Sequence, residues 1–185
     1  MSMRFKESGV AFLLGVLFAL QVTGAERSAE LDRAEEWELA GINRESAAAH
    51  MQSEADLLSE DADLKLRDRE GIPTKRRAVL AAAASMCFRA GNLYGTAAGN
   101  LDHAAENWGK SAASFVKLEL PERARIARER ATHAQTGGTV ACRLAAESYE
   151  KAAIIYADSL LNDSPQAAKA NEKAAAWREN LATRH

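Results

Sequence analysis

The chain has few of the residues that interrupt helices or build cofactor sites. Its 185 residues include three prolines, two cysteines and four histidines, and aromatic residues make up 6%. Runs of β-branched residues are almost absent, and no alternating apolar and polar stretch is long enough to predict a strand. Good helix formers, alanine above all, dominate what remains. The composition therefore predicts one all-α domain of ordinary size.

The motifs that carry catalytic or metal chemistry are also missing. There is no Cys-x-x-Cys-His haem site, no zinc-type cluster and no Glu-x-x-His pair of the kind that builds a di-iron bundle. A phosphate loop and a Gly-x-Ser-x-Gly nucleophile elbow are absent as well. His103 with Glu106 and Glu129 with His133 could each share a helix face, but we interpret them as exposed polar residues. We expect a protein that is not an enzyme and that has no metal or cofactor.

The net charge of −2 hides an uneven distribution. Residues 26–70 carry 14 acids and 6 bases, whereas residues 71–135 carry 10 bases and 5 acids. Such an asymmetry can steer a charged partner, or it can let an acidic N-terminal segment pack on a basic middle section. We favour the internal explanation. Nucleic-acid binding is not expected, because the chain is not basic overall and no basic patch is interleaved with aromatics.

The first 25 residues resemble a secretory signal peptide. Arg4 and Lys6 form a basic start, and an apolar stretch of 11 residues follows from Val10 to Leu20. Small residues then offer cleavage sites after Gly24 or after Ala25. The apolar stretch is shorter than the roughly 20 residues of a membrane-spanning helix. We expect a cleaved leader and export to the periplasm or the extracellular space, with a retained membrane anchor or an organellar presequence as alternatives.

Export would place the two cysteines in an oxidising compartment. Cys87 and Cys142 are an even pair, and a disulfide between them would close a long loop. The alternative is that both are small, buried, apolar residues on helices. Spacing alone leaves both readings open.

The pattern of apolar residues and breaks predicts roughly six helices in three antiparallel hairpins. Residues 26–70 form an acidic helical segment, with an expected break near Gly41 to Asn43. Residues 71–185 form the remaining domain, in which Pro121 begins a helix and Thr74 is a fair N-cap. Further breaks are expected at Gly71 to Pro73, at Gly99–Asn100, at Thr136 to Gly138 and at Asn162 to Pro165.

One segment of the chain is nearly repeated. AAENWGKSAASF, residues 104–115, is followed 41 residues later by AAESYEKAAIIY, residues 145–156. In each copy two aromatics and an alanine lie at i, i+4 and i+7, on one helix face. We expect these residues to pack one hairpin on the next: Ala104, Trp108, Ala112 and Phe115 in the first copy, and Ala145, Tyr149, Ala153 and Tyr156 in the second.

Residues 78–160 resemble the tetratricopeptide family of helical hairpin repeats. Ala90-Gly91-Asn92-Leu93-Tyr94 is similar to the Leu-Gly-x-x-Tyr of that family's first helix. Gly99, Ala104 and Trp108 are similar to the turn glycine, the small residue and the bulky aromatic of its second helix. One extra residue between the halves and the position of Pro121 depart from the family. The looser hairpins of soluble NSF-attachment proteins are also similar.

The resemblance implies a short solenoid that binds another protein or a peptide on a concave face. Asn92, Asn100, Lys110 and Lys117 are polar residues of the kind that could line it. We therefore expect an exported, non-enzymatic scaffold for protein–protein interaction. The alternatives are an alanine-rich helical bundle that binds a small ligand or metal, and a membrane-anchored subunit of a larger envelope or organellar assembly.

Overall fold

The structure, a computed structural model, describes the backbone of residues 6–67 and 73–184, and the side chains of residues 24–67 and 75–184. Four long helices make up nearly all of the described chain: α1 (Lys6–Arg67), α2 (Pro73–Lys117), α3 (Pro121–Tyr156) and α4 (Ser164–Ala182). No strand is present in these residues. The prediction of an all-α fold is confirmed, but the chain has four helices and not about six.

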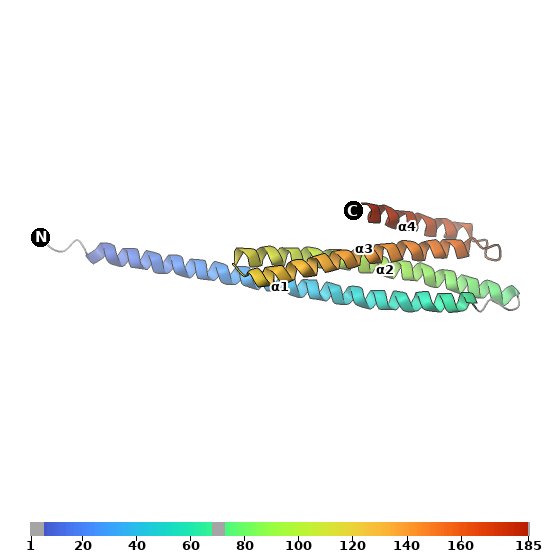
Figure 1. The fold of residues 1–185 in the computed structure, drawn as a ribbon, viewed down its shortest axis with the longest axis horizontal. Helices are drawn as coiled ribbons and strands as arrows, with labels where there is room; N and C mark the ends of the chain where they lie inside the picture. Colours follow the sequence, from blue (N-terminus) through green and yellow to red (C-terminus); the bar gives the residue numbers. More distant parts are fainter. Residues whose placement is uncertain (1–5, 68–72, 185) are drawn as a thin grey trace.

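The helices form an elongated antiparallel bundle (Figure 1). α1 packs along α2, α2 along α3, and α3 along the shorter α4. Figure 1 shows that α1 continues past the turn between α2 and α3, and that α4 covers only part of the length of α3. The neighbours in sequence are thus the neighbours in space, as short connections require.

A spacing of seven residues explains why these helices stay together over such a length. The buried small residues of α1 recur at intervals of seven: Ala34, Gly41, Ala48, Ala55 and Ala62. A strict seven-residue repeat keeps one seam of a helix facing its partner and gives a left-handed coiled coil. Small residues on this seam let the backbones of α1 and α2 approach closely.

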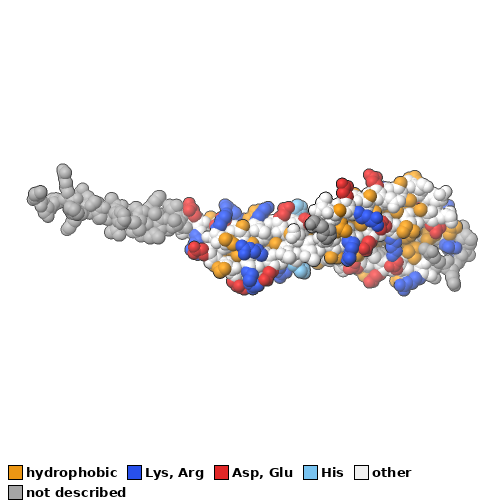
Figure 2. Space-filling model, turned by 45° about the horizontal axis from the view of Figure 1, so that its top comes forward, with side chains coloured by type: hydrophobic (Ala, Val, Ile, Leu, Met, Phe, Trp, Pro, Cys, Tyr) orange, Lys and Arg blue, Asp and Glu red, His pale blue; other side chains and the backbone are white. Residues whose placement is uncertain are grey.

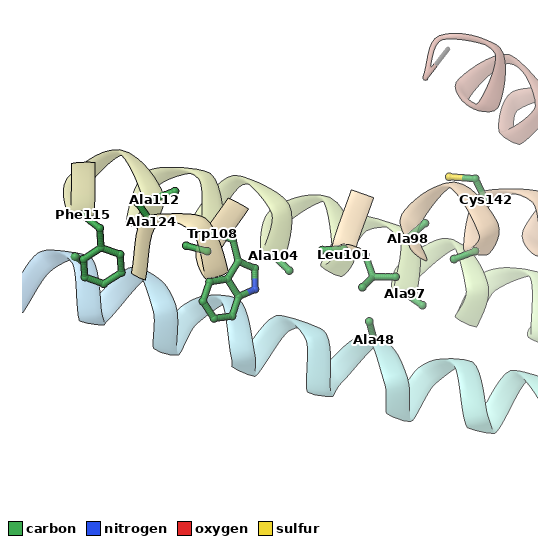
Figure 3. Packing of buried hydrophobic residues seen from close by; sticks show 14 of the residues in the cluster. Ala48, Ala97, Ala98, Leu101, Ala104, Trp108, Ala112, Phe115, Ala124 and Cys142 are labelled. Carbon is green, nitrogen blue, oxygen red and sulfur yellow. The ribbon is translucent and has the colours of Figure 1, made fainter. Parts of the chain in front are cut away.

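α2 carries two such repeats, because it packs against more than one neighbour. One consists of larger buried residues: Leu80, Cys87, Tyr94, Leu101, Trp108 and Phe115. The other is small: Ala83, Ala90, Ala97, Ala104 and Ser111, with Leu118 following in the turn after α2. The alternation of large and small side chains fills the space between helices, and Figure 3 shows Trp108 and Phe115 projecting from α2 toward α1.

Three expected helix breaks were wrong. Gly41 lies inside α1, Gly99 and Asn100 lie inside α2, and Gly137 and Gly138 lie inside α3. None of the described glycines has a positive φ, so none of them forms a turn of that kind. Most of these glycines instead give room to a side chain from a neighbouring helix. The heptad seam also continues through each site, so packing favours helix on both sides.

Other boundaries agree with the sequence. α3 begins at Pro121, and α4 begins at Ser164 with Asp163 as its N-cap, whose side chain accepts a hydrogen bond from the Gln166 backbone amide. α2 already begins at Pro73, so Thr74 lies within it and is not a cap. The expected break at Gly71 falls on residues outside the described part.

The connection between α2 and α3 is a tight helix-ending turn. Glu119 has a φ of 59°, in the left-handed region. The backbone amide of Leu120 donates to the Phe115 carbonyl at 2.9 Å, and that of Glu119 to the Val116 carbonyl at 3.1 Å. This pair of bonds is a Schellman motif, in which glycine usually occupies the position held here by Glu119.

Candidate functional site

The two copies of the repeated segment lie on adjacent helices. Ala104, Trp108, Ala112 and Phe115 are buried on α2, and Ala145, Tyr149 and Ala153 are buried on α3. Tyr156, at the end of α3, is partly buried against the cluster that contains Cys87. All eight therefore lie at least partly inside the bundle. They do not form successive hairpins, because the turn expected at Gly99 lies inside α2 and each copy belongs to one continuous helix.

Two buried aromatics, Trp108 and Tyr149, and the partly buried Trp177 each lie against a glycine of another helix. A Cβ atom added at Gly41 would lie 2.8 Å from the indole of Trp108, and one added at Gly91 would lie 3.0 Å from the Tyr149 ring. At Gly95 the added Cβ would lie 2.5 Å from the Trp177 indole of α4. These contacts, which we call glycine sockets, fix the register of α1 on α2, α3 on α2, and α4 on α2.

Two arginines of α3 link this helix to both α1 and α2. The Arg123 guanidinium contacts the Glu35 and Glu38 carboxylates of α1 at 3.0 and 2.7 Å, and it lies 4.1 Å from the ring centroid of Phe115 in α2. Partial burial acts to lower the pKa of Arg123, but the two glutamates outweigh this and raise it. The guanidinium thus stays charged while covering an aromatic face.

The same arrangement recurs one heptad further along. Arg130 contacts Glu45 at 3.4 Å and lies 6.0 Å from the ring of Trp108, whose Nε1 donates a hydrogen bond to the other carboxylate oxygen of Glu45 at 3.0 Å. Lys117 with Glu30, and Lys151 with Asp63, add two more links to α1. These pairs support the internal explanation of the charge asymmetry.

The polar residues predicted to line a concave face are engaged within the bundle. The Asn92 side chain accepts a hydrogen bond from the Tyr149 hydroxyl at 2.6 Å, and buried Asn100 accepts one from Arg44 at 2.9 Å. Lys110 lies 4.5 Å from the ring centroid of Trp37, and Lys117 pairs with Glu30. Each contact joins two helices of the bundle, and Asn92, Lys110 and Lys117 stay exposed while Asn100 is buried.

Both cysteines are buried free thiols in different clusters of the core, so the possible disulfide is not formed. Burial raises the pKa of each thiol. The Cys142 sulfur lies 3.9 Å from the Asn180 side-chain oxygen of α4, whereas Cys87 packs near the α3–α4 connection. The two act as small packing residues, as the alternative reading predicted.

The remaining candidates for chemistry stay apart. His103 and Glu106 form an exposed pair at 3.8 Å, and Arg125 pairs with Glu122 and Glu129 on the solvent side of α3. Within the described residues, no three His, Cys, Asp or Glu side chains are placed to share a metal ion. The described surface has an open hollow of about 420 Å³ beside Arg27, Lys117 and Glu119, and one of about 330 Å³ between α3 and α4.

Comparisons with protein-family models, with curated proteins and with solved structures found no match. The resemblance to tetratricopeptide repeats is thus not supported by a family match, and what is shown is an all-α bundle of four helices packed together.

Large apolar side chains also lie on the outside of the bundle. On α3, Ile126, Val140 and Ile154 are 43, 40 and 73% exposed and recur at intervals of 14 residues, which is one face of a coiled-coil helix. On α1, Leu57 and Leu64 are 64 and 61% exposed and lie one heptad apart. Figure 2 shows hydrophobic side chains scattered between charges of both signs on one face of the described part. Sequence reasoning missed these faces, although the seven-residue spacing reveals them.

Proposed function

We propose that the protein is a non-enzymatic helical scaffold that binds another protein along the outside of its bundle. The observation that carries the proposal is the repeat of exposed apolar residues on one face of α3: Ile126, Val140 and Ile154. Exposed His133 and Glu147 occupy the heptad positions between them, so a partner on this face would meet three separate apolar contacts flanked by polar ones. The proposal does not depend on tetratricopeptide-like hairpins.

The internal contacts support a rigid scaffold. Glycine sockets and arginine links fix each helix relative to its neighbour, so the outer faces are held in a constant register. Rigid presentation lowers the entropic cost of binding. The bundle interior is occupied by alanines and aromatics, and this packing is the reason that we rank the small-ligand or metal-binding bundle second.

Export remains part of the proposal. Among the described side chains, the first to make a hydrogen bond outside α1 is Arg27, which donates to the carbonyl of Leu118, just after α2, at 3.0 Å. Cleavage after Ala25 would thus leave every described bond between helices intact. Most of the expected leader, and the apolar stretch of the alternative membrane anchor, lie outside the described side chains. Among the residues that the structure describes, no helix is long and apolar enough to cross a membrane.

Site-specific photo-crosslinking in the native cell tests the scaffold. A photoreactive residue at Ile154 or Val140 should give discrete crosslinked species with another protein, and one at Arg143, exposed on the same helix, provides a control for surface labelling. A purified native protein that carries a stoichiometric metal or small ligand in mass spectrometry would overturn the proposal. N-terminal sequencing of the same material should show a start near Glu26, and an intact Met1 would favour the anchored subunit.

A further inference from the structure

The surface of α2 and α3 that holds α4 continues beyond the end of α4. The Trp177 indole lies on Gly95, and Arg184 pairs with Asp102 at 2.5 Å, so α4 runs parallel to α2 and reaches only as far as Asp102. Both contacts join residues 82 positions apart, which shows a constant register. Figure 1 shows the remaining length of α2 and α3 without α4.

On this uncovered length, α2 has another glycine on the face that holds Trp177. Gly109 lies two heptads after Gly95 and therefore on the same side of the helix. It is exposed, and a Cβ atom added there would meet nothing within 4 Å, in contrast to Gly95. Val116, one heptad further along and 49% exposed, adds an apolar side chain to this face.

α3 contributes a positive charge to the same face. Cys142 faces α4, since its sulfur lies near Asn180, and Arg128 lies two heptads before Cys142. Arg128 is exposed, and no described residue forms a salt bridge with it. The uncovered face thus combines an exposed glycine, an exposed valine and one exposed arginine.

We propose that this face, defined by Gly109, Val116 and Arg128, binds an amphipathic helix of a partner protein, in line with α4. The partner helix would place a large apolar residue, as Trp177 does, on Gly109, and an acidic residue beside Arg128. The face continues the surface of α2 and α3 on which α4 packs, so the partner helix would lie along the same direction as α4. The positive charge of Arg128 favours a partner helix with acidic residues along one edge. This inference rests on the proposed scaffold function and adds to it a second surface, distinct from the face of Ile126, Val140 and Ile154, with one class of partner.

A defined peptide tests the face. The probe is a synthetic, fluorescein-labelled helical peptide of about 20 residues, with a central Trp on its apolar side and glutamates along one edge. Fluorescence anisotropy should show binding to the full chain, and at least tenfold weaker binding to Gly109→Leu and Arg128→Glu. Gly99→Leu is the matched control, because an added Cβ at Gly99 also meets nothing within 4 Å. A peptide with Ala in place of Trp should bind at least tenfold more weakly.

Circular dichroism of each variant establishes that it is folded. No binding of the Trp peptide, or equal binding to wild type and Gly109→Leu, overturns the proposal. A wild-type dimer in analytical ultracentrifugation that Gly109→Leu dissociates would assign the face to a second copy of the chain and also overturn it. Crosslinks at Ile154 would still appear in that case, so failure of this inference is distinguishable from failure of the scaffold.

Discussion

The Trp108 indole of α2 lies directly on the backbone of Gly41 in α1, with room for no additional atom between them. Its Nε1 donates a hydrogen bond to Glu45, one helical turn further along α1. One aromatic residue thus fixes both the distance and the register of the two helices. Tyr149 on Gly91 and Trp177 on Gly95 repeat this relationship between α3 and α2 and between α4 and α2.

Gly41→Ala should destabilise the protein by about 1–3 kcal/mol, because the new Cβ atom would overlap the Trp108 ring. Gly109→Ala should instead stabilise it by about 0.5–1 kcal/mol, since alanine favours helix and nothing lies near its Cβ atom. Urea unfolding followed by circular dichroism measures both. Equal effects of the two substitutions would show that the socket does not exist.

Glu119→Gly should raise the free energy of unfolding by about 1 kcal/mol. Residue 119 has a φ of 59°, a conformation that glycine adopts without the steric cost that a Cβ atom brings. Glu106→Gly, in the middle of α2, is the control and should lower stability by about the same amount. A loss of stability in Glu119→Gly would contradict the turn geometry.

Arg123 and Glu38 should couple energetically. A double-mutant cycle with Arg123→Gln and Glu38→Gln is expected to give about 0.5–1 kcal/mol, because both groups are partly shielded and the guanidinium also covers Phe115. High salt should reduce this coupling. The more exposed pair Arg125 and Glu129 should give a smaller value, and a reversed order of the two pairs would be evidence against the link between α1 and α3.

Alkaline pH should destabilise the fold. Burial raises the pKa of Tyr149 to about 12, and burial together with the hydrogen bond to Asp56 raises that of Tyr94 to about 12. The unfolded chain loses these phenolic protons near pH ~10, so stability present below that pH falls as the pH rises toward 12. Urea midpoints measured across this range should decrease. The double variant Tyr94→Phe and Tyr149→Phe should show a weaker dependence, and an equal dependence would exclude the two tyrosines as the cause.

The helical class and several boundaries could be predicted from sequence, because they depend on local signals. The start of α3 at Pro121 and the start of α4 within the stretch from Asn162 to Pro165 are examples. The glycines were misinterpreted because glycine permits both a turn and close helix contact, and only the neighbouring helix decides between them. At Gly41 the deciding neighbour is Trp108, 67 positions away in the chain. The interval of seven from Ala34 through Ala62 is the signal that favours an uninterrupted helix.

The candidate site could be predicted only in part. The packing role of Trp108 and Tyr149 followed from their helical spacing, whereas the uncovered face at Gly109 depends on where α4 ends. The register that places this end beside Asp102 depends on the pairing of Arg184 with Asp102, a contact between distant parts of the chain. No local pattern contains this information.

A distance within α2 tests the central claim, that the chain forms continuous helices in a rigid bundle. Spin labels at Ala81→Cys and Ala113→Cys, both exposed positions, can be introduced after Cys87 and Cys142 are replaced by alanine. Double electron–electron resonance should give about 48 Å, the length of 32 residues of uninterrupted helix. A hairpin turn at Gly99 would instead bring the two labels within about 20 Å of each other, and that result would contradict the account.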